Sequence, residues 1–192
     1  MKDLTPFVRL ITVFLILVAG ANAQEGDTKN PSSPKAVQLQ REKEAAASKY
    51  VPVHVYDPKR NAELDIRNAT VEAARTGKRI LLEVGGDWCV WCHIMDSFFE
   101  KNPDLLRVRE KNFVMVKINF SEENKNEQVL SRYPPINGYP HLFVLAQDGK
   151  LLHSQDTAKL EVGKSYDLAK FMAFLKEWSP RQKEGSGLPV AH

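Results

Sequence analysis

The chain has 192 residues, of which 43% are hydrophobic and 27% charged, and its formal net charge is +3. This length and composition support one globular core of ordinary size with polar extensions, so a single domain is expected. The basic residues are scattered, without a long cluster or interleaved aromatic side chains, which argues against nucleic-acid binding.

The N-terminus has the layout of a secretory signal peptide. Lys2 and Arg9 flank an apolar run at residues 10–19, and small residues follow up to Ala23. Cleavage after Ala23 would remove residues 1–23. The alternative, an uncleaved anchor, needs about 20 apolar residues to cross a bilayer, and this run is shorter. We therefore expect a soluble protein in the periplasm or extracellular space, without a stable membrane anchor.

Polar segments flank the expected domain. Residues 24–50 contain two prolines and then a stretch rich in Ala, Glu and Lys, which indicates a linker or a marginal, solvated helix. Residues 179–192 contain Pro, Gly and Ser without any periodicity, and are expected to form a flexible tail. The folded domain is therefore predicted to span residues 51–178.

The first elements of this domain are a strand, a helix and a second strand. Alternating valines at residues 51–56 predict a half-buried strand. Apolar residues at helical spacing predict a helix over residues 62–76, ended by Gly77. Residues 79–84 form a short apolar run, interrupted once by Glu83, that is typical of a central strand.

The cysteine segment comes next and is predicted to be helical to about Asn102, where Pro103 stops or kinks the helix. Residues 104–111 are expected to add one or two further helical turns. Residues 113–120 predict the next central strand, and residues 122–132 a short polar helix.

A hairpin and a helix are expected to close the domain. Residues 139–146 and 150–154 predict two strands, joined at Gln147-Asp148-Gly149 by a strong turn signal. Residues 164–178 carry an apolar face at helical spacing. Parallel strands need crossover helices whereas a hairpin is antiparallel, so we predict an α/β fold with a mixed central β-sheet and helices on both faces.

The chain contains two cysteines, and both lie in the sequence Cys89-Val90-Trp91-Cys92. A disulfide stabilises mainly by closing a long loop in the unfolded chain, and this one closes a very short loop, so its value is expected to lie in reactivity. Cys89 begins the predicted helix, where unpaired N–H groups and the helix dipole favour a thiolate. We predict that Cys89 is the nucleophile, that Cys92 resolves the mixed disulfide, and that no cofactor other than this redox-active disulfide is needed.

Glu83 is the candidate for handling the proton that Cys92 must lose. A central strand with helices on both faces would bury this residue beneath the cysteine helix, and a buried carboxyl of raised pKa is the usual acceptor. Lys117, which interrupts an apolar segment of the next strand, could offset the charge of Glu83. The alternative for Glu83 is a solvent-facing position at an edge of the sheet.

Several of these motifs together resemble the thioredoxin superfamily over about residues 51–178. Residues 80–83 followed by residues 86–92 look like the family's strand and active-site turn, with Glu83 at the position of the family's buried acid. Residues 117–119 resemble the strand that supplies the family's buried lysine. The resemblance implies a thioredoxin fold for this domain.

The segment Gly138-Tyr139-Pro140 stands where the family has its cis-proline loop, which faces the cysteines. The resemblance implies that Pro140 is cis and that the backbone of Tyr139 pairs with an extended substrate peptide. An ordinary trans turn proline is the alternative. Trp88, Trp91 and Tyr139 are expected to form an apolar rim on which the substrate docks.

The function implied by the resemblance is thiol-disulfide exchange with protein substrates outside the cytosol, by a monomer that a redox partner recharges. Val90-Trp91 differs from the Gly-Pro of cytosolic reducing members and from the Pro-His of strongly oxidising periplasmic members. Since this dipeptide supplies no cation to stabilise the thiolate, a reductase or interchange role is favoured over a strong oxidant. The Cys-x-Trp-Cys-His-x-Met segment is also similar to a subgroup with poorly defined functions, and its His93 is expected to modulate the site.

Three alternatives remain for the same residues. Cys89, Cys92, His93 and Met95 are soft ligands of the kind that select Cu(I), so copper handling is the main alternative. The Cys-x-x-Cys-His pattern also fits covalent c-type haem attachment, although a small cytochrome would be mostly helical. A thioredoxin-fold interaction module with incidental cysteines is the third alternative.

Overall fold

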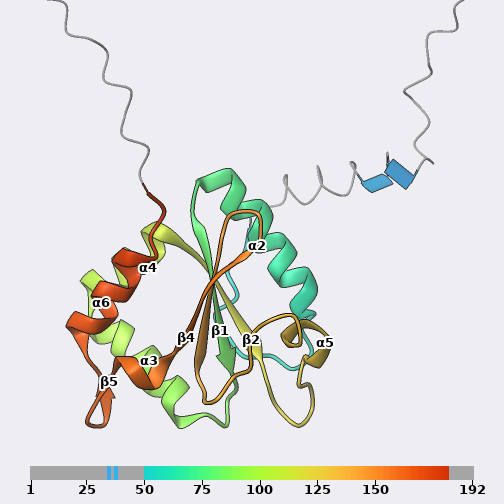
Figure 1. Ribbon diagram of the computed structural model, residues 1–192. Coiled ribbons are helices and arrows are strands. Elements are labelled where there is room, and N and C mark those ends of the chain that lie inside the picture. Colours follow the sequence, from blue (N-terminus) through green and yellow to red (C-terminus); the bar gives the residue numbers. More distant parts are fainter. Residues whose placement is uncertain (1–33, 36, 39–49, 182–192) are drawn as a thin grey trace, which may run out of the picture. The chain divides into compact units, whose positions relative to one another are not determined.

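The computed structural model describes residues 34, 35, 37, 38 and 50–181 (Figure 1). The predicted signal peptide, the rest of the predicted linker up to residue 49 and the predicted tail beyond residue 181 lie outside the described residues. In the part of the chain that the structure describes, no helix combines the length and the apolar composition that crossing a membrane requires.

The domain is built on a four-stranded mixed sheet with the strand order β2-β1-β3-β4. β1 (Arg79–Gly85) pairs in parallel with β2 (Phe113–Asn119) and antiparallel with β3 (His141–Leu145). β3 pairs antiparallel with β4 (Leu151–Asp156). The predicted mixed sheet is thus confirmed, with β1 and β3 in its centre.

Helices cover both faces of this sheet, as predicted. α2 (Ala62–Thr76) lies on one face, and α3 (Val90–Lys101), α4 (Pro103–Asn112) and α6 (Leu168–Glu177) lie on the other (Figure 1). Because successive side chains of a strand point to opposite faces, β1 contributes to two hydrophobic clusters. One cluster is built with α2, and the other with α3, α4 and α6.

Local signals fix the ends of the predicted helices. The Asn61 side chain caps α2 by accepting a hydrogen bond from the N–H of Leu64 at 3.0 Å. Gly77 ends α2 with a φ of 75°, a left-handed conformation that suits glycine. The predicted break at Pro103 is also confirmed: α3 ends at Lys101, and the proline occupies the first turn of α4, where its missing N–H is harmless.

The predicted strand at residues 51–56 is wrong for most of its length. A single bridge joins Val53 to Val116 of β2, and the N–H of Lys117 donates to the Val53 carbonyl at 3.0 Å. The neighbouring valines are exposed, and Pro52 has no N–H with which to extend a ladder. The alternating valines therefore mark one point of attachment to the sheet.

The predicted polar helix at residues 122–132 is wrong except for one turn, α5 (Glu127–Leu130). The conformation of the chain before α5 is fixed by hydrogen bonds of an asparagine. Asn126 has a φ of 48°, and its side-chain amide donates to the carbonyl of Asn119 at 2.7 Å. Bonds of this kind from side chain to backbone compete with helix formation.

The predicted closing helix at residues 164–178 begins later than expected, because Asp167 caps α6 by accepting a backbone N–H at 3.0 Å. A two-stranded hairpin of β5 (Glu161–Val162) and β6 (Ser165–Tyr166) precedes it, after the 3-10 turn η1 (Thr157–Leu160). Strands of two residues carry no readable periodicity, so the sequence did not reveal this hairpin.

An aromatic cluster holds α6 and the hairpin against α3. The ring of Phe171 in α6 is wholly buried, with its centroid 5.0 Å from that of Phe99 in α3 and 5.5 Å from that of Tyr166 in β6. Both pairs are close to perpendicular, which is the favoured edge-to-face arrangement. The helix that carries the cysteines is therefore positioned by large, rigid side chains.

Phe171→Ala is expected to lower the free energy of unfolding by about 3–5 kcal/mol, because it opens a cavity at the centre of this cluster. Urea denaturation followed by circular dichroism measures the loss. Leu168→Ala on the same helix is the matched control, since Leu168 is 47% exposed, and its cost is expected to stay near about 0.5 kcal/mol. Equal losses for the two variants would contradict the assignment of this core.

Candidate active site

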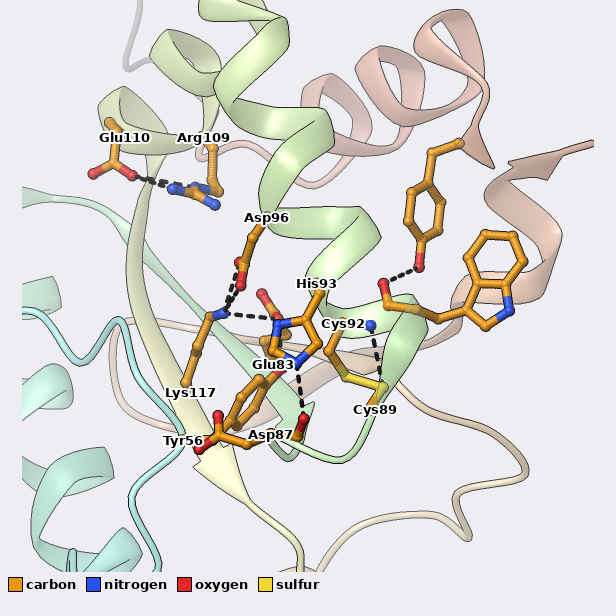
Figure 2. Close-up of polar contacts among 12 residues, drawn as sticks. Tyr56, Glu83, Asp87, Cys89, Cys92, His93, Asp96, Arg109, Glu110 and Lys117 are labelled. Atoms are coloured by element: carbon orange, nitrogen blue, oxygen red, sulfur yellow. Dashed lines mark hydrogen bonds and ion pairs between the residues drawn. A yellow bond between two sulfur atoms is a disulfide. The ribbon is translucent and has the colours of Figure 1, made fainter. Parts of the chain in front are cut away.

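The two cysteines lie where β1 gives way to α3 (Figure 2). Cys89 is the N-cap residue of α3, and its Sγ accepts a hydrogen bond from the backbone N–H of Cys92 at 3.1 Å. A disulfide joins the two residues, whose Cα atoms are 5.3 Å apart. The Cys89 sulfur thus occupies the end of the helix at which backbone dipoles favour negative charge.

Aromatic side chains enclose the disulfide. Cys89 is 3% exposed and Cys92 is wholly buried, with Tyr56, Trp91 and Tyr139 packed against them. A nucleophilic cysteine must be within reach of its substrate. In the oxidised state only a small part of Cys89 reaches solvent.

Gly85, the last residue of β1, leaves room for Cys92. A Cβ at this position would lie 2.5 Å from the Sγ of Cys92 and 2.9 Å from the hydroxyl oxygen of Tyr56. Such contacts are too short for any side chain, so the close approach requires glycine. Sequence reasoning missed both Gly85 and Tyr56, because nothing local marks contacts that only the fold creates.

Glu83 lies in β1 beneath α3 and is wholly buried. Its Oε1 accepts a hydrogen bond from the Tyr56 hydroxyl at 2.5 Å, while its Oε2 has no hydrogen-bond partner among the described residues. Burial raises the pKa of Glu83, and the charge of Lys117 and the bond from Tyr56 oppose that shift. The buried position expected from the sequence is therefore the one observed, and not an edge of the sheet.

Lys117 faces Glu83 across the parallel pair of β1 and β2, but its nearest partner is another acid. Its Nζ is 3.5 Å from Oε1 of Glu83, and 2.6 and 2.7 Å from the two carboxylate oxygens of Asp96 in α3 (Figure 2). Lys117 thus offsets the charge of Glu83 only in part. Asp96 was missed, although its place four residues after Cys92 puts the two on one helix face.

A pair of aromatic side chains, the exposed Trp88 and the half-buried Tyr139, borders the site. Trp88 is 55% exposed, its indole N–H donates to the Phe120 carbonyl at 2.6 Å, and its ring lies edge-on to Tyr139 at 5.5 Å. The peptide bond between Tyr139 and Pro140 is cis. Trp91, which was also expected at the rim, packs with its ring centroid 5.6 Å from that of Tyr166.

The ligand set of the copper hypothesis is divided between different environments. Met95 is wholly buried in the hydrophobic core. His93 is exposed, and its Nε2 lies 2.8 Å from the carbonyl oxygen of Asp87 (Figure 2). The two cysteine sulfurs are bonded to each other. This geometry gives the copper hypothesis no support, and the mixed sheet differs from the mostly helical architecture that the haem hypothesis requires.

This fold is similar to that of known proteins. A family described as thioredoxin-like matches residues 61–147. Among solved structures, the disulphide isomerase from Xylella fastidiosa Temecula1 has a TM-score of 0.54 and 22% sequence identity, covering 67% of this chain and 98% of that chain. The domain therefore has the thioredoxin fold, and its residues 61–147 resemble the thioredoxin-like family.

Two curated proteins are similar in sequence to part of this chain. Spermatogenesis-associated protein 20 of Mus musculus is 30% identical over 116 residues, which are 58% of this chain and 14% of that protein. The thiol:disulfide interchange protein DsbD of Klebsiella pneumoniae subsp. pneumoniae is 25% identical over 117 residues, which are 61% of this chain and 18% of that protein. The chain thus spans less than a fifth of the length of either relative.

Glu83→Gln is expected to stabilise the thioredoxin domain at alkaline pH and to have little effect at acidic pH. The raised pKa means that the folded state binds the proton of Glu83 more tightly than the unfolded state does. The wild-type stability therefore falls as the pH rises from the unfolded pKa through the folded one, whereas the variant escapes this loss. Each pKa unit of difference corresponds to about 1.4 kcal/mol.

Urea unfolding at about pH 4 and about pH 8 measures this effect on either side of the carboxyl's ordinary titration range. The control is Glu122→Gln, whose side chain is 94% exposed and which is expected to change stability by less than about 0.5 kcal/mol at both pH values. A gain for Glu83→Gln that does not depend on pH would show that the buried charge is not its cause.

Proposed function

We propose that this protein is a thiol-disulfide oxidoreductase that exchanges disulfides with protein thiols outside the cytosol. The observation that carries the proposal is the Cys89 sulfur at the N-terminus of α3, bonded to Cys92, with the buried carboxyl group of Glu83 in the strand that precedes this helix. An N-terminal helix position favours the thiolate that such chemistry needs. The signal-like N-terminus supports a location in the periplasm or extracellular space, where disulfides persist.

The exchange proceeds in two steps, each of which forms one disulfide bond and breaks another. The Cys89 thiolate attacks a substrate disulfide, forms a mixed disulfide and releases one substrate thiolate. Cys92 gives its proton to Glu83 and attacks the Cys89 sulfur, which breaks the mixed disulfide and releases the second substrate thiolate. Two electrons pass from the cysteine pair to the substrate, and the pair ends in the oxidised state present in this structure.

Substrate binding is assigned to the aromatic border and the cis-proline loop. Trp88 offers an exposed apolar surface beside Tyr139, and the backbone of Tyr139 pairs with an extended segment of the substrate. Pro140, with its cis peptide bond, shapes this loop. Trp91 packs against the cysteine pair and borders the disulfide. Extended or unfolded protein segments fit such a surface better than small thiols do.

The residues between the cysteines bear on the direction of electron flow. Val90 and Trp91 bring no positive charge to the Cys89 thiolate, so the reduced state is not strongly stabilised. A role as a reductase or in interchange is therefore favoured over that of a strong oxidant. A dithiol redox partner recharges the pair after each turnover, and the redox-active disulfide takes the place of any other cofactor.

Cys89→Ser is expected to reduce the activity to the uncatalysed rate, because the variant has no nucleophile for the first step. Turbidity from insulin reduction in the presence of dithiothreitol measures this activity. A surface variant such as Glu122→Gln keeps the wild-type rate and serves as the control. Catalysed insulin reduction by Cys89→Ser would refute the proposed mechanism.

Cys92→Ser is expected to trap the substrate, because the first step still occurs and the second does not. Non-reducing electrophoresis and mass spectrometry detect the mixed disulfide at Cys89 as an adduct that dithiothreitol removes. Cys89→Ser, tested in parallel, forms no such adduct. An adduct that persists in the Cys89→Ser variant would assign the attacking role to Cys92.

A further inference from the structure

Tyr56 contacts both the buried acid and the cysteine pair, and the two-step exchange leaves it without a role. Its side chain is buried and belongs to the same cluster as Cys89 and Cys92. Its hydroxyl donates to Oε1 of Glu83 at 2.5 Å, so the hydroxyl end of the ring points toward the carboxyl group (Figure 2). An apolar ring would fill this space equally well, which raises the question of what the hydroxyl does.

The position of Gly85 shows how near this hydroxyl is to the resolving sulfur. The Sγ of Cys92 and the hydroxyl oxygen of Tyr56 lie 2.5 and 2.9 Å from one point, the Cβ position of Gly85. The Cys92 sulfur and the Tyr56 hydroxyl oxygen are therefore at most 5.4 Å apart. The hydroxyl thus donates to the group that can take the proton and lies within that distance of the sulfur that must lose one.

The Tyr56 hydroxyl is suited to relaying a proton, and not to remaining as a charged phenolate. Burial, and then the charge of Glu83, raise the pKa of Tyr56 well above its ordinary value, so the hydroxyl stays protonated. Such a group can donate its own hydrogen to one neighbour while it accepts another hydrogen from a second neighbour. Its protonation state is the same before and after the transfer.

We propose that the hydroxyl of Tyr56 relays the proton of the Cys92 thiol to the carboxylate of Glu83, an inference that rests on the proposed oxidoreductase function. The Tyr56 proton moves to Oε1 of Glu83, and the Cys92 proton moves to the Tyr56 oxygen. The resulting Cys92 thiolate attacks the Cys89 sulfur, and the bond from that sulfur to the substrate breaks. The substrate thiolate leaves, and Glu83 carries the proton.

Other charged groups face the two ends of this relay and remain in place when the hydroxyl is removed. Lys117 of β2 and Arg109 of α4 favour the ionised form of Glu83, whereas Asp96 of α3 disfavours it. The groups that raise the pKa of Tyr56 through their charge are Glu83, Asp96 and Tyr166. Because the bond from Tyr56 lowers the pKa of Glu83, its loss raises that pKa, and a test must separate this shift from the relay itself.

Tyr56→Phe keeps the ring and removes only the hydroxyl. The reduced full chain is mixed with glutathione disulfide and quenched with acid, and mass spectrometry follows the glutathione adduct on Cys89 over time. We expect the adduct to form at the wild-type rate and to resolve at least about tenfold more slowly, because positioned proton transfer contributes a factor of this order or more. The rates are compared at a pH at which carbon-13 NMR of the carboxyl shows Glu83 ionised in both proteins.

The pH profile separates a relay from a structural defect. At high pH, where Cys92 ionises without help, the two resolution rates are expected to converge. A variant that stays slow at every pH would overturn the relay in favour of a structural role. Tyr50→Phe is the matched control, since it also loses a hydroxyl, one that donates to the Met115 carbonyl at 3.2 Å, and it is expected to keep both wild-type rates.

Two further outcomes would contradict the relay and the oxidoreductase function separately. If Tyr56→Phe resolves the adduct as fast as the wild type while Glu83→Gln is slow, then Glu83 takes the proton directly and the relay is wrong. If the reduced wild type forms no adduct with glutathione disulfide or with the disulfides of insulin, the proposed oxidoreductase function fails, and the relay fails with it.

Discussion

The charge of Glu83, placed where water does not reach, governs the arrangement around the cysteines. A buried carboxylate must be compensated by its neighbours; here two segments supply most of that compensation and a third opposes it. Tyr56 donates a hydrogen bond from the chain before α2, Lys117 approaches from β2, and Asp96 of α3 draws that lysine toward itself. The compensation is incomplete, and this is why the group keeps a raised pKa and remains able to accept a proton.

The start of α3 serves the fold and the chemistry with the same atoms. Every helix begins with backbone N–H groups that lack partners, and here one of them is satisfied by the sulfur of Cys89. The disulfide closes too short a loop to add much stability, so the domain does not depend on it. The packing of α3 comes instead from Phe99 and its aromatic neighbours, which lets the bond open and close on a fixed helix.

Local signals explain which parts of the structure the sequence predicts. The helix at residues 62–76 carries both of its caps, and the charged interruption at Glu83 is visible within one strand. Where the outcome depends on distant contacts, prediction fails: the alternating valines at residues 51–56 lack a ladder partner beyond one bridge, and Asn126 replaces a helix with side-chain hydrogen bonds. Tyr56 belongs to the same class, because its partners lie more than two dozen residues away along the chain.

The two residues between the cysteines have unequal freedom to vary. Val90 is 69% exposed, whereas Trp91 packs on Tyr166 and receives a hydrogen bond on its carbonyl from that tyrosine at 3.3 Å. Evolutionary drift at the first position can adjust the redox potential without disturbing the core. Variation at Trp91 is constrained by its contacts with the hairpin. Only Val90 can therefore be changed independently of the core when this motif is engineered.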